Sequence, residues 1–474
     1  MAIPSDRLRA ANDAPVNPAG DYVLYWMIAA RRPRDSFALD HALEQARALR
    51  KPLLVFEPLR RGYWWAADRF HHFVHQGMRA NQVAFGAAGV TYLPYIEPED
   101  GDDKGLLAAL ARHAALVVTD RFPTYFLPRM VASAAAALPV RVDVVDGLGI
   151  VPLDATPRAF SVAHSFRRWV QKNVRPMLDT WPEEAPLRGY DLGPAVLPDL
   201  SRWPNAFGPE PPPSVGGPGP VARRGGFGEA EAVLASFLEQ RLARYHDARN
   251  DPDESAASGL SPWLHFGHVG AHRVLRAVLD HDRWTPDELA PKATGKRAGW
   301  WGASPPVEAF LDEVLTWREV GHVFAHHVPD HDRYESLPAW ALTTLDDHRY
   351  DPRQVYTLDA LDQARTDDEV WNAAQRELVR SGTMHNYLRM LWGKKVLQWS
   401  PSPEVALARL IELNNRYALD GRDPNSTSGI FWVFGRFDRA WGPERPIFGK
   451  VRYMTSASTR RKLRLANYLA RWAA

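Results

Sequence analysis

Tryptophan is unusually frequent in this chain, with 18 among 474 residues. Trp392 and Trp399 are seven residues apart in one predicted helix, so they share a face and are separated by about 10 Å of rise. Trp371 precedes a predicted helix break at Ser381-Gly382 and could meet them across a tight pair of helices. On spacing alone, an aromatic seam between helices is the better interpretation, and an electron-conducting row is the alternative.

A carboxylate and an aromatic ring are also predicted to lie side by side. Glu313 and Trp317 stand at positions i and i+4 of one predicted helix, so they share a face. Glu313 could protonate or hydrogen-bond a base, although most helical glutamates form surface ion pairs, for example with the nearby Arg318. Arg389 and Asp420 come from different polar stretches, and a buried ion pair beside a cofactor competes with an ordinary surface pair.

Two further segments suggest binding. The run LDGRDPNSTSGIFW, 419–432, reads as a turn-rich polar loop before a strand or helix, and such loops often bind ligands. The segment 445–464 carries no acid and could hold phosphates, or it could simply be a solvated basic helix. Its basic residues are Arg445, Lys450, Arg452, Arg460, Arg461, Lys462 and Arg464. The net charge of +2 does not by itself indicate a polyanion partner.

The elements that must position these residues fall into two patterns. Residues 21–146 alternate apolar strand-like runs with helical stretches, the first of them opened by Asp35 or Ser36, which predicts a doubly wound parallel sheet. No glycine-rich nucleotide motif occurs there. Residues 182–226 are rich in Pro and Gly, and the chain from Glu229 onward is helical in pattern. We therefore expect an α/β domain at 20–181, a linker at 182–226 and an all-α domain at 227–474.

Composition excludes several functional classes. The chain has no cysteine, so disulfides, thiolate zinc sites, iron–sulfur clusters and cysteine nucleophiles are excluded, and redox chemistry needs an organic cofactor. No metal is expected. No apolar run approaches the ~20 residues that span a bilayer, and the N-terminus does not resemble a signal peptide. These features predict a cytoplasmic protein.

Long strings of the second half resemble class II cyclobutane pyrimidine dimer photolyases, within the photolyase/cryptochrome family. The strings are SGLSPWLHFG (258–267), AFLDEVLTWREV (309–320), WNAAQRELVRSGTMHNYLRMLWGKK (371–395), LNNRYALDGRDPN (413–425) and ERPIFGKVRYM (444–454). YWM (25–27) and DSFAL (35–39) match the N-terminal region of the family more loosely. The resemblance covers nearly the whole chain.

The resemblance implies an N-terminal antenna domain and a C-terminal helical domain that binds FAD and DNA. The implied enzyme is a carbon–carbon lyase that flips a pyrimidine dimer out of double-stranded DNA and splits it by light-driven electron transfer from reduced FAD. It implies a monomer that associates with the nucleoid through DNA. A second antenna chromophore, of deazaflavin or folate type, is left open, as is its absence.

Matching positions assign expected roles to individual residues. Catalytic and electron-transfer roles fall on Glu313, Asn414, Trp371, Trp392 and Trp399. Cofactor contacts fall on Tyr245, Arg249, Asn250, Gly259, Leu260, Ser261, Arg389 and Asp420. Contacts with DNA or the lesion fall on Trp317, Tyr387, Met390, Trp432 and Arg452.

The chain also departs from the family pattern. Leu391 replaces an aromatic residue, Trp263 replaces a tyrosine, and the segment after Trp432 is about one residue shorter than expected. Two other functions therefore stay in view: a cryptochrome-like blue-light sensor with FAD but little or no repair, and a light-independent DNA-binding module. The sensor is disfavoured because the chain retains Glu313, Trp317, Met390 and Trp432, and the tryptophan spacing argues against the simple module.

Overall fold

The computed structural model describes residues 3–474. By its contacts the chain divides into two compact units. Unit 1 comprises the chain through Pro157 together with Pro176–Ala232 and Leu260–Arg276, and unit 2 comprises Arg158–Arg175, Val233–Gly259 and Ala277–Ala474. The chain thus passes between the units several times, and the Pro/Gly-rich segment 182–226 lies within unit 1.

Unit 1 is built on one six-stranded sheet in the order β1-β6-β5-β2-β3-β4. Strands β2 to β6 are parallel, as the alternation over 21–146 predicts, and β1 adds an antiparallel edge beside β6. Strand β1 was not expected, because its three residues form no recognisable pattern. The strands are β1 (Leu8–Ala10), β2 (Tyr22–Trp26), β3 (Leu53–Leu59), β4 (Thr91–Ile96), β5 (Ala114–Asp120) and β6 (Val142–Val145).

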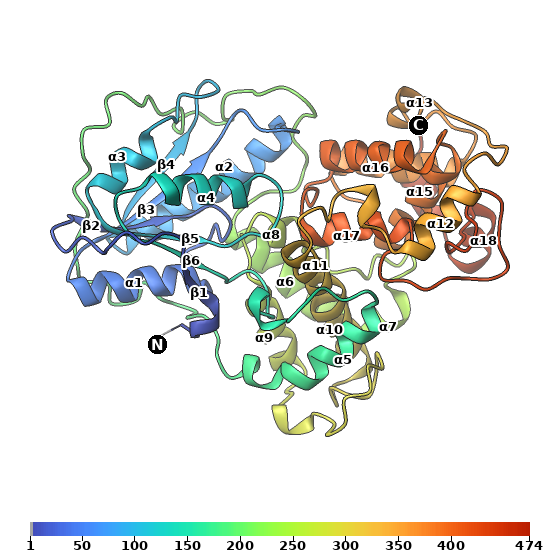
Figure 1. The fold of residues 1–474 in the computed structure, drawn as a ribbon, viewed down its shortest axis with the longest axis horizontal. Coiled ribbons are helices and arrows are strands. Elements are labelled where there is room, and N and C mark those ends of the chain that lie inside the picture. Colours follow the sequence, from blue (N-terminus) through green and yellow to red (C-terminus); the bar gives the residue numbers. More distant parts are fainter. Residues whose placement is uncertain (1–2) are drawn as a thin grey trace. The chain divides into compact units, whose positions relative to one another are not determined.

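Helices cover both faces of this sheet, so the doubly wound prediction is confirmed (Figure 1). Leu24 of the central strand β2 packs toward α3 (Leu106–Arg112) and α4 (Leu127–Ala137). Its neighbour Val23 packs toward α1 (Phe37–Leu49) and the end of α2 (Asp68–Ala87). Successive residues of a strand point to opposite faces, so a strand buried on both sides must be apolar throughout. Ser36 begins α1 as predicted, because its side chain accepts the Leu39 N–H.

Unit 2 is helical, in agreement with the predicted second fold class. The predicted all-α domain, however, does not coincide with unit 2. Helix α8 (Ser261–His265) lies wholly within the ranges of unit 1, and α6 (Phe227–Gln240) and α9 (Ala271–His281) lie partly within them. The helices of unit 2 are α5 (Ala163–Asn173), α7 (Tyr245–Ala248), α10 (Pro305–Leu311), α11 (Glu319–His327), α12 (Ala339–Asp347), α13 (Leu358–Asp362), α14 (Glu369–Ser381), α15 (Asn386–Gln398), α16 (Pro403–Tyr417), α17 (Pro424–Val433), α18 (Ser456–Lys462) and α19 (Ala466–Arg471).

Local sequence signals explain the ends of α14. The Asp368 side chain accepts the Trp371 N–H at the start of the helix. Gly382 ends it in the left-handed conformation, with φ 70°, which a residue without Cβ adopts at little cost. The predicted break at Ser381-Gly382 is therefore confirmed. The break lets the chain turn back, so that α15 packs against α14 and both helices contribute to one apolar core.

The predicted helix that carries Glu313 and Trp317 is not regular. Between α10 and α11 lies a π-helical segment, η6 (Asp312–Arg318). Inside it the buried Asp312 carboxylate forms a two-point ion pair with Arg167 of α5, at 2.5 and 3.0 Å. π-Helical turns are rare and often occur at functional sites. The sequence could not reveal it, because the helix pattern continues unbroken through this segment.

No helix in the described part of the chain, residues 3–474, combines the length and apolar character that a membrane span requires.

Candidate active site

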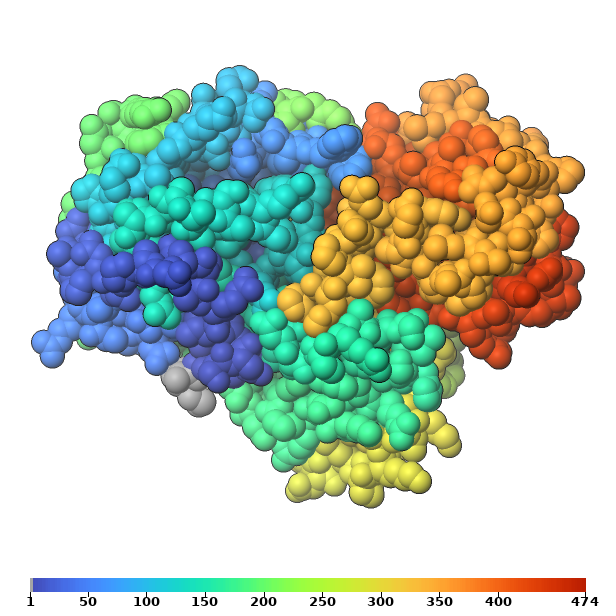
Figure 2. Space-filling view, in the orientation of Figure 1, coloured from blue at the N-terminus to red at the C-terminus, as the bar shows by residue number. Residues whose placement is uncertain are grey.

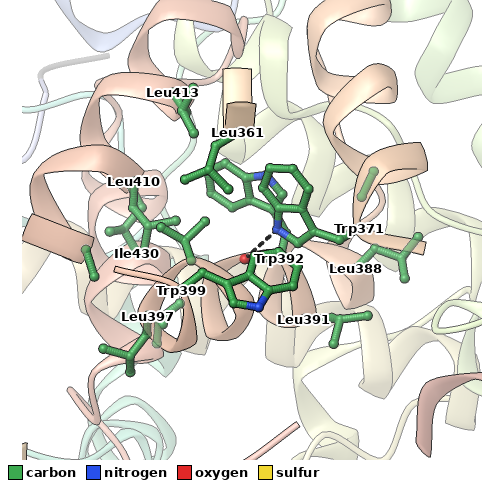
Figure 3. Packing of buried hydrophobic residues seen from close by; sticks show 14 of the residues in the cluster. Leu361, Trp371, Leu388, Leu391, Trp392, Leu397, Trp399, Leu410, Leu413 and Ile430 are labelled. Atoms are coloured by element: carbon green, nitrogen blue, oxygen red, sulfur yellow. Dashed lines mark hydrogen bonds between the residues drawn. The ribbon is translucent and has the colours of Figure 1, made fainter. Parts of the chain in front are cut away.

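Trp371, Trp392 and Trp399 lie together in the core of unit 2 (Figure 3). The Trp371 indole Nε1 donates to the Trp392 carbonyl at 3.0 Å, and its ring meets the Trp399 ring edge-on at a centroid distance of 5.5 Å. Trp371 therefore contacts both of the others and connects α14 to α15. Trp392 donates through its own Nε1 to the Gln375 Oε1 at 2.9 Å. All three indoles are at most 5% exposed.

A second group combines charges and amides at the ends of α15 and α16. The Arg389 guanidinium lies 3.1 Å from the Asp420 carboxylate and donates to the Asn414 Oδ1 at 3.4 Å. Both charged side chains are mostly buried, at 18% and 13% exposure, so the ion pair expected between them is formed. The Asn414 amide Nδ2 donates to the Ser426 Oγ of α17 at 3.0 Å and to Asn415. The group presents a fixed guanidinium, a carboxylate and an amide.

Glu313 sits in the π-helical segment and faces Arg249, not Arg318. Its Oε1 lies 4.0 Å from the Arg249 Nε, whereas Arg318 pairs with Glu319. Burial, reinforced by the charge of Asp312, raises the pKa of Glu313 to about 7, although 32% of its side-chain surface still meets solvent. Near neutral pH this carboxyl group is therefore protonated in a large part of the molecules.

Tyr245 supports Arg249 from the other side. The Arg249 guanidinium lies over the Tyr245 ring at 5.5 Å, and that ring packs edge-on against Phe310 of α10 at 5.3 Å. Burial raises the pKa of Tyr245, so its phenol stays neutral. Helices α7 and α10 together hold Arg249 next to Glu313.

Trp317 and Trp432 form a separate aromatic pair. Their rings are 4.9 Å apart between centroids and tilted by 36°. Both are partly exposed, in contrast to the three core tryptophans. Trp317 follows Glu313 by four residues in η6, so the carboxyl group and the aromatic pair share one face of this segment.

Helix α17 connects these groups. Its start is fixed by Asp423, whose side chain accepts the Asn425 N–H. Ser426 then contacts Asn414, and Trp432 at the far end contacts Trp317. The segment that the sequence indicated as a polar loop before a strand or helix is therefore partly a helix, and it links α16 to η6.

The remaining expected site residues lie elsewhere on the surface or in the core. Asn250 and Gly259 are exposed in unit 2, Leu260 and the exposed Ser261 belong to the range of unit 1, and Gly259 has a φ of 72°. Tyr387 and Met390 of α15 are partly buried against the core that holds the three tryptophans. Arg452 is exposed and lies over the Trp441 ring at 5.3 Å.

The basic C-terminal segment includes helix α18. Its last turn carries Arg460, Arg461 and Lys462, where positive charge is favourable to the helix dipole. A capping box at Thr455 begins the helix. The red C-terminal part of the chain reaches the surface on the face shown in Figure 2. Some of the charge is neutralised locally, because Arg460 pairs with Glu369.

Three contacts of the site were not expected from the sequence: Ser426 on Asn414, Gln375 on Trp392, and Arg167 on Asp312. Gln375 stands in a string that resembles the family, and Ser426 directly follows another such string and lies in the polar run 419–432, which were the only signals in the sequence. Of the departures, Leu391 is buried in the core of unit 2, while Trp263 is buried in unit 1 and donates to the Arg224 carbonyl at 3.0 Å. Both substitutions are therefore accommodated by packing.

Comparison with known proteins places this architecture. No family model matches the chain. The chain is 34% identical over 474 residues to the deoxyribodipyrimidine photo-lyase of Methanothermobacter thermautotrophicus, covering 99% of this chain and 98% of the relative. It is 34% identical to the enzyme of that name from Oryza sativa subsp. japonica, covering 98% and 90% of the two chains.

A solved structure agrees in fold. The crystal structure of a bacterial class III photolyase from Agrobacterium tumefaciens superposes with a TM-score of 0.68 at 18% identity, over 96% of this chain and 86% of that chain. On its full-length relatives, the chain belongs to the deoxyribodipyrimidine photo-lyase family, and it is accordingly a lyase.

Proposed function

We propose that this chain repairs DNA by splitting cyclobutane pyrimidine dimers in light, with FAD as its cofactor. The observation that best supports the proposal is the Trp317–Trp432 pair beside the protonatable Glu313. A flipped dimer offers two flat faces and carbonyl oxygens, and partly exposed indoles with a nearby hydrogen-bond donor suit both. The names of the full-length relatives point to the same substrate.

The residues of unit 2 fit a flavin. A flavin ring presents an imide edge with acceptors and a donor, and the cluster of Arg389, Asp420 and Asn414 offers donors and acceptors held in place by burial. When bound and reduced, FAD supplies the electron that light releases. Tyr245, Arg249, Asn250, Gly259, Leu260 and Ser261 are proposed to hold the rest of the cofactor.

Each group of the chain then has a distinct task. Arg389 and Asp420 orient the ring, while Asn414 donates or accepts a hydrogen bond at its edge. The indoles of Trp371, Trp392 and Trp399 pass electrons through the core to keep the cofactor reduced, since neighbouring aromatic rings give an electron successive places to reside. Gln375 fixes the orientation of Trp392.

Glu313 acts on the lesion. A protonated carboxyl near a pyrimidine carbonyl donates a hydrogen bond that strengthens as negative charge develops on that base. Trp317 and Trp432 stack on the flipped bases, with Tyr387 and Met390 beside them on α15. Arg452 and the basic segment 445–464 contact the phosphates of the duplex.

We also propose a place for a second, planar chromophore in unit 1. Three aromatic residues gather where β3 and β5 end: Tyr63 and Trp65 each face Tyr125, at 6.5 and 6.1 Å. Carboxyl ends of parallel strands are the usual ligand-binding edge of such sheets. Absorption of the purified protein beyond the flavin bands, lost on replacing Trp65 and Tyr125 with alanine, would support a deazaflavin or folate type of ligand.

The deciding experiment is repair itself. Purified protein should show a flavin spectrum and release FAD on denaturation. When illuminated with an oligonucleotide that contains one defined dimer, it should restore the absorbance of the intact pyrimidines, and it should do nothing in the dark. Bound flavin with photoreduction but no repair would instead support a cryptochrome-like sensor, and a colourless DNA-binding protein would refute both.

A further inference from the structure

A lysine inside the core of unit 2 has no role in the chemistry described above. Lys394 lies on α15, two residues after Trp392, and is only 2% exposed. Its ammonium group donates to the main-chain carbonyl of Val433, the last residue of α17. A buried ammonium is costly unless it is paired or hydrogen-bonded, so its position demands an explanation.

At the final turn of α17, Lys394 provides a hydrogen bond from outside the helix, whereas the neighbouring carbonyls are bonded locally. The carbonyl of Phe431 accepts the N–H groups of Phe434 and Arg436, and that of Trp432 accepts the Gly435 N–H. These bonds are local to the end of the helix. The Val433 carbonyl accepts its bond from a side chain of another helix, Lys394 of α15. A cation at the C-terminus of a helix also interacts favourably with the helix dipole.

The two helices also pack closely where Gly393 of α15 meets the Val433 side chain of α17. A Cβ atom added to Gly393 would lie 2.4 Å from a Val433 methyl group, closer than any real contact. A side chain at position 393 would displace the Val433 side chain, so glycine lets α15 pack closely against the end of α17. Gly393 and Lys394 together fix the position of Val433, and Trp432 is the residue before it.

We propose that Lys394 is a positioning residue for the aromatic pair: by binding the end of α17 it holds the Trp432 ring against Trp317. The importance of that pair for lesions rests on the proposed function above, whereas its geometry does not. Trp392 and Lys394 are two residues apart on α15, so they point to nearly opposite sides of it, and one helix serves both the core tryptophans and the exposed pair.

The charge environment makes this contact sensitive to pH. Burial lowers the pKa of Lys394 to about 7, with Asp438 acting to raise it and Arg452 to lower it further. The ammonium is thus close to losing its proton near neutral pH. A neutral amine is a weaker donor to the Val433 carbonyl and no longer complements the helix dipole.

Fluorine NMR of the full-length flavoprotein labelled with fluorotryptophan tests the proposal directly. Signals of Trp317 and Trp432 are assigned by replacing each with phenylalanine. Lys394→Met keeps the length of the side chain and removes the donor, and we expect it to shift or broaden both signals. The Trp284 and Trp301 signals, from another contacting pair in unit 2 with centroids 5.7 Å apart, should stay in place.

A matched variant is available on the next residue. Lys395→Met removes an ammonium that pairs with Asp368 at 3.3 Å, away from α17. It should leave the Trp317 and Trp432 signals unchanged. If Lys394→Met does not fold, Lys394→Gln retains an uncharged donor and should give a smaller displacement of the same two signals. In Glu313→Gln, which removes the other group with a pKa of about 7 beside the pair, the Trp317 and Trp432 signals should still move together between about pH 6 and pH 9, as Lys394 titrates.

Binding of a lesion distinguishes the positioning role of Lys394 from the proposed repair function. Lys394→Met should weaken binding of a dimer-containing oligonucleotide by about tenfold, which corresponds to partial loss of one base stack. Unmoved Trp317 and Trp432 signals in folded Lys394→Met or Lys394→Gln would overturn the positioning role. Displaced signals in a protein that binds no lesion even as wild type would keep the positioning role and refute the proposed function.

Discussion

Two tryptophan groups of unit 2, the core trio and the Trp317–Trp432 pair, consist of the same residue type in opposite surroundings. Trp371, Trp392 and Trp399 are enclosed by apolar side chains, and two of their N–H groups are satisfied inside the protein (Figure 3). Trp317 and Trp432 pack against each other at a tilt of 36°, while part of each ring faces solvent. Enclosed rings can exchange electrons but cannot meet DNA, whereas partly exposed rings can stack on a base.

The difference shows that environment, not residue type, assigns the task. Burial keeps water from the core indoles and fixes their mutual distances. The exposed pair lies instead beside a carboxyl group with a raised pKa and depends on the end of α17 for its position. Substitutions in the core group should therefore change photoreduction and not lesion affinity, and substitutions in the exposed pair should change lesion affinity and not photoreduction.

The largest effect is expected from Trp392→Phe. Phenylalanine is a much poorer electron donor than tryptophan, and its ring leaves the buried Gln375 Oε1 without its donor. Photoreduction of oxidised flavin, followed by absorbance under blue light, should fall to a small residual rate. Repair by chemically reduced enzyme and affinity for the lesion should remain close to wild type. Unchanged photoreduction would remove Trp392 from the electron path.

The next largest effect concerns the exposed pair. Alanine at Trp317 or Trp432 removes a stacking surface worth ~1–3 kcal/mol per base, so lesion affinity should fall by about tenfold to a hundredfold. Fluorescence titration with a dimer-containing duplex measures it. Photoreduction should stay normal, and Trp64→Ala, which changes a tryptophan that is 76% exposed in unit 1, should leave affinity intact. A loss of photoreduction in Trp317→Ala would break the division between the two groups.

How far the sequence anticipated this arrangement differs from residue to residue. The five parallel strands of unit 1 follow from apolar runs buried on both faces, whereas β1 does not, and the end of α14 follows from a single glycine. The pairing of Arg389 with Asp420 depended on resemblance, because residues 31 apart meet only through the fold. Neither the π-helical turn nor the contact of Lys394 with Val433 leaves a local signal, because hydrogen-bond register and burial are set by packing between helices.

A smaller effect should come from the ion pair proposed to orient the flavin. Asp420→Asn removes the negative charge opposite Arg389 but keeps an acceptor, and leaving a mostly buried charge poorly paired costs ~1–3 kcal/mol. Flavin affinity should therefore fall by about tenfold, measured as the flavin-to-protein ratio after gel filtration and by titration of the apoprotein. Asp359→Asn, in an exposed pair with Arg365, should have no measurable effect. Equal flavin retention in both variants would remove the ion pair from the cofactor site.

The smallest effect concerns the Glu313 carboxyl group, which lies beside the exposed pair and distinguishes it from the core tryptophans. Burial, with the charge of Asp312, raises the pKa of Glu313 from 4.5 to about 7. Between these two values the folded protein holds a proton that the unfolded chain releases, so the contribution of Glu313 to stability declines as pH rises from about 4.5 to about 7. Glu313→Gln should remove that slope from a series of melting curves.

Catalysis should follow the same titration. Below about pH 7 the Glu313 carboxyl donates a hydrogen bond to the pyrimidine carbonyl, and above it the carboxylate repels the charge that develops there. Repair per absorbed photon by chemically reduced wild type should thus fall a few-fold as pH rises through about 7. With the lesion at saturating concentration, so that a change of lesion affinity through Lys394 does not enter, Glu313→Gln should give a flat profile, because its amide donates at every pH. Glu313→Ala should give a flat profile at a lower yield, while lesion affinity changes less in either. Because Trp317 and Trp432 do not titrate, a wild-type yield that does not depend on pH would mean that stacking alone distinguishes the exposed pair from the core tryptophans.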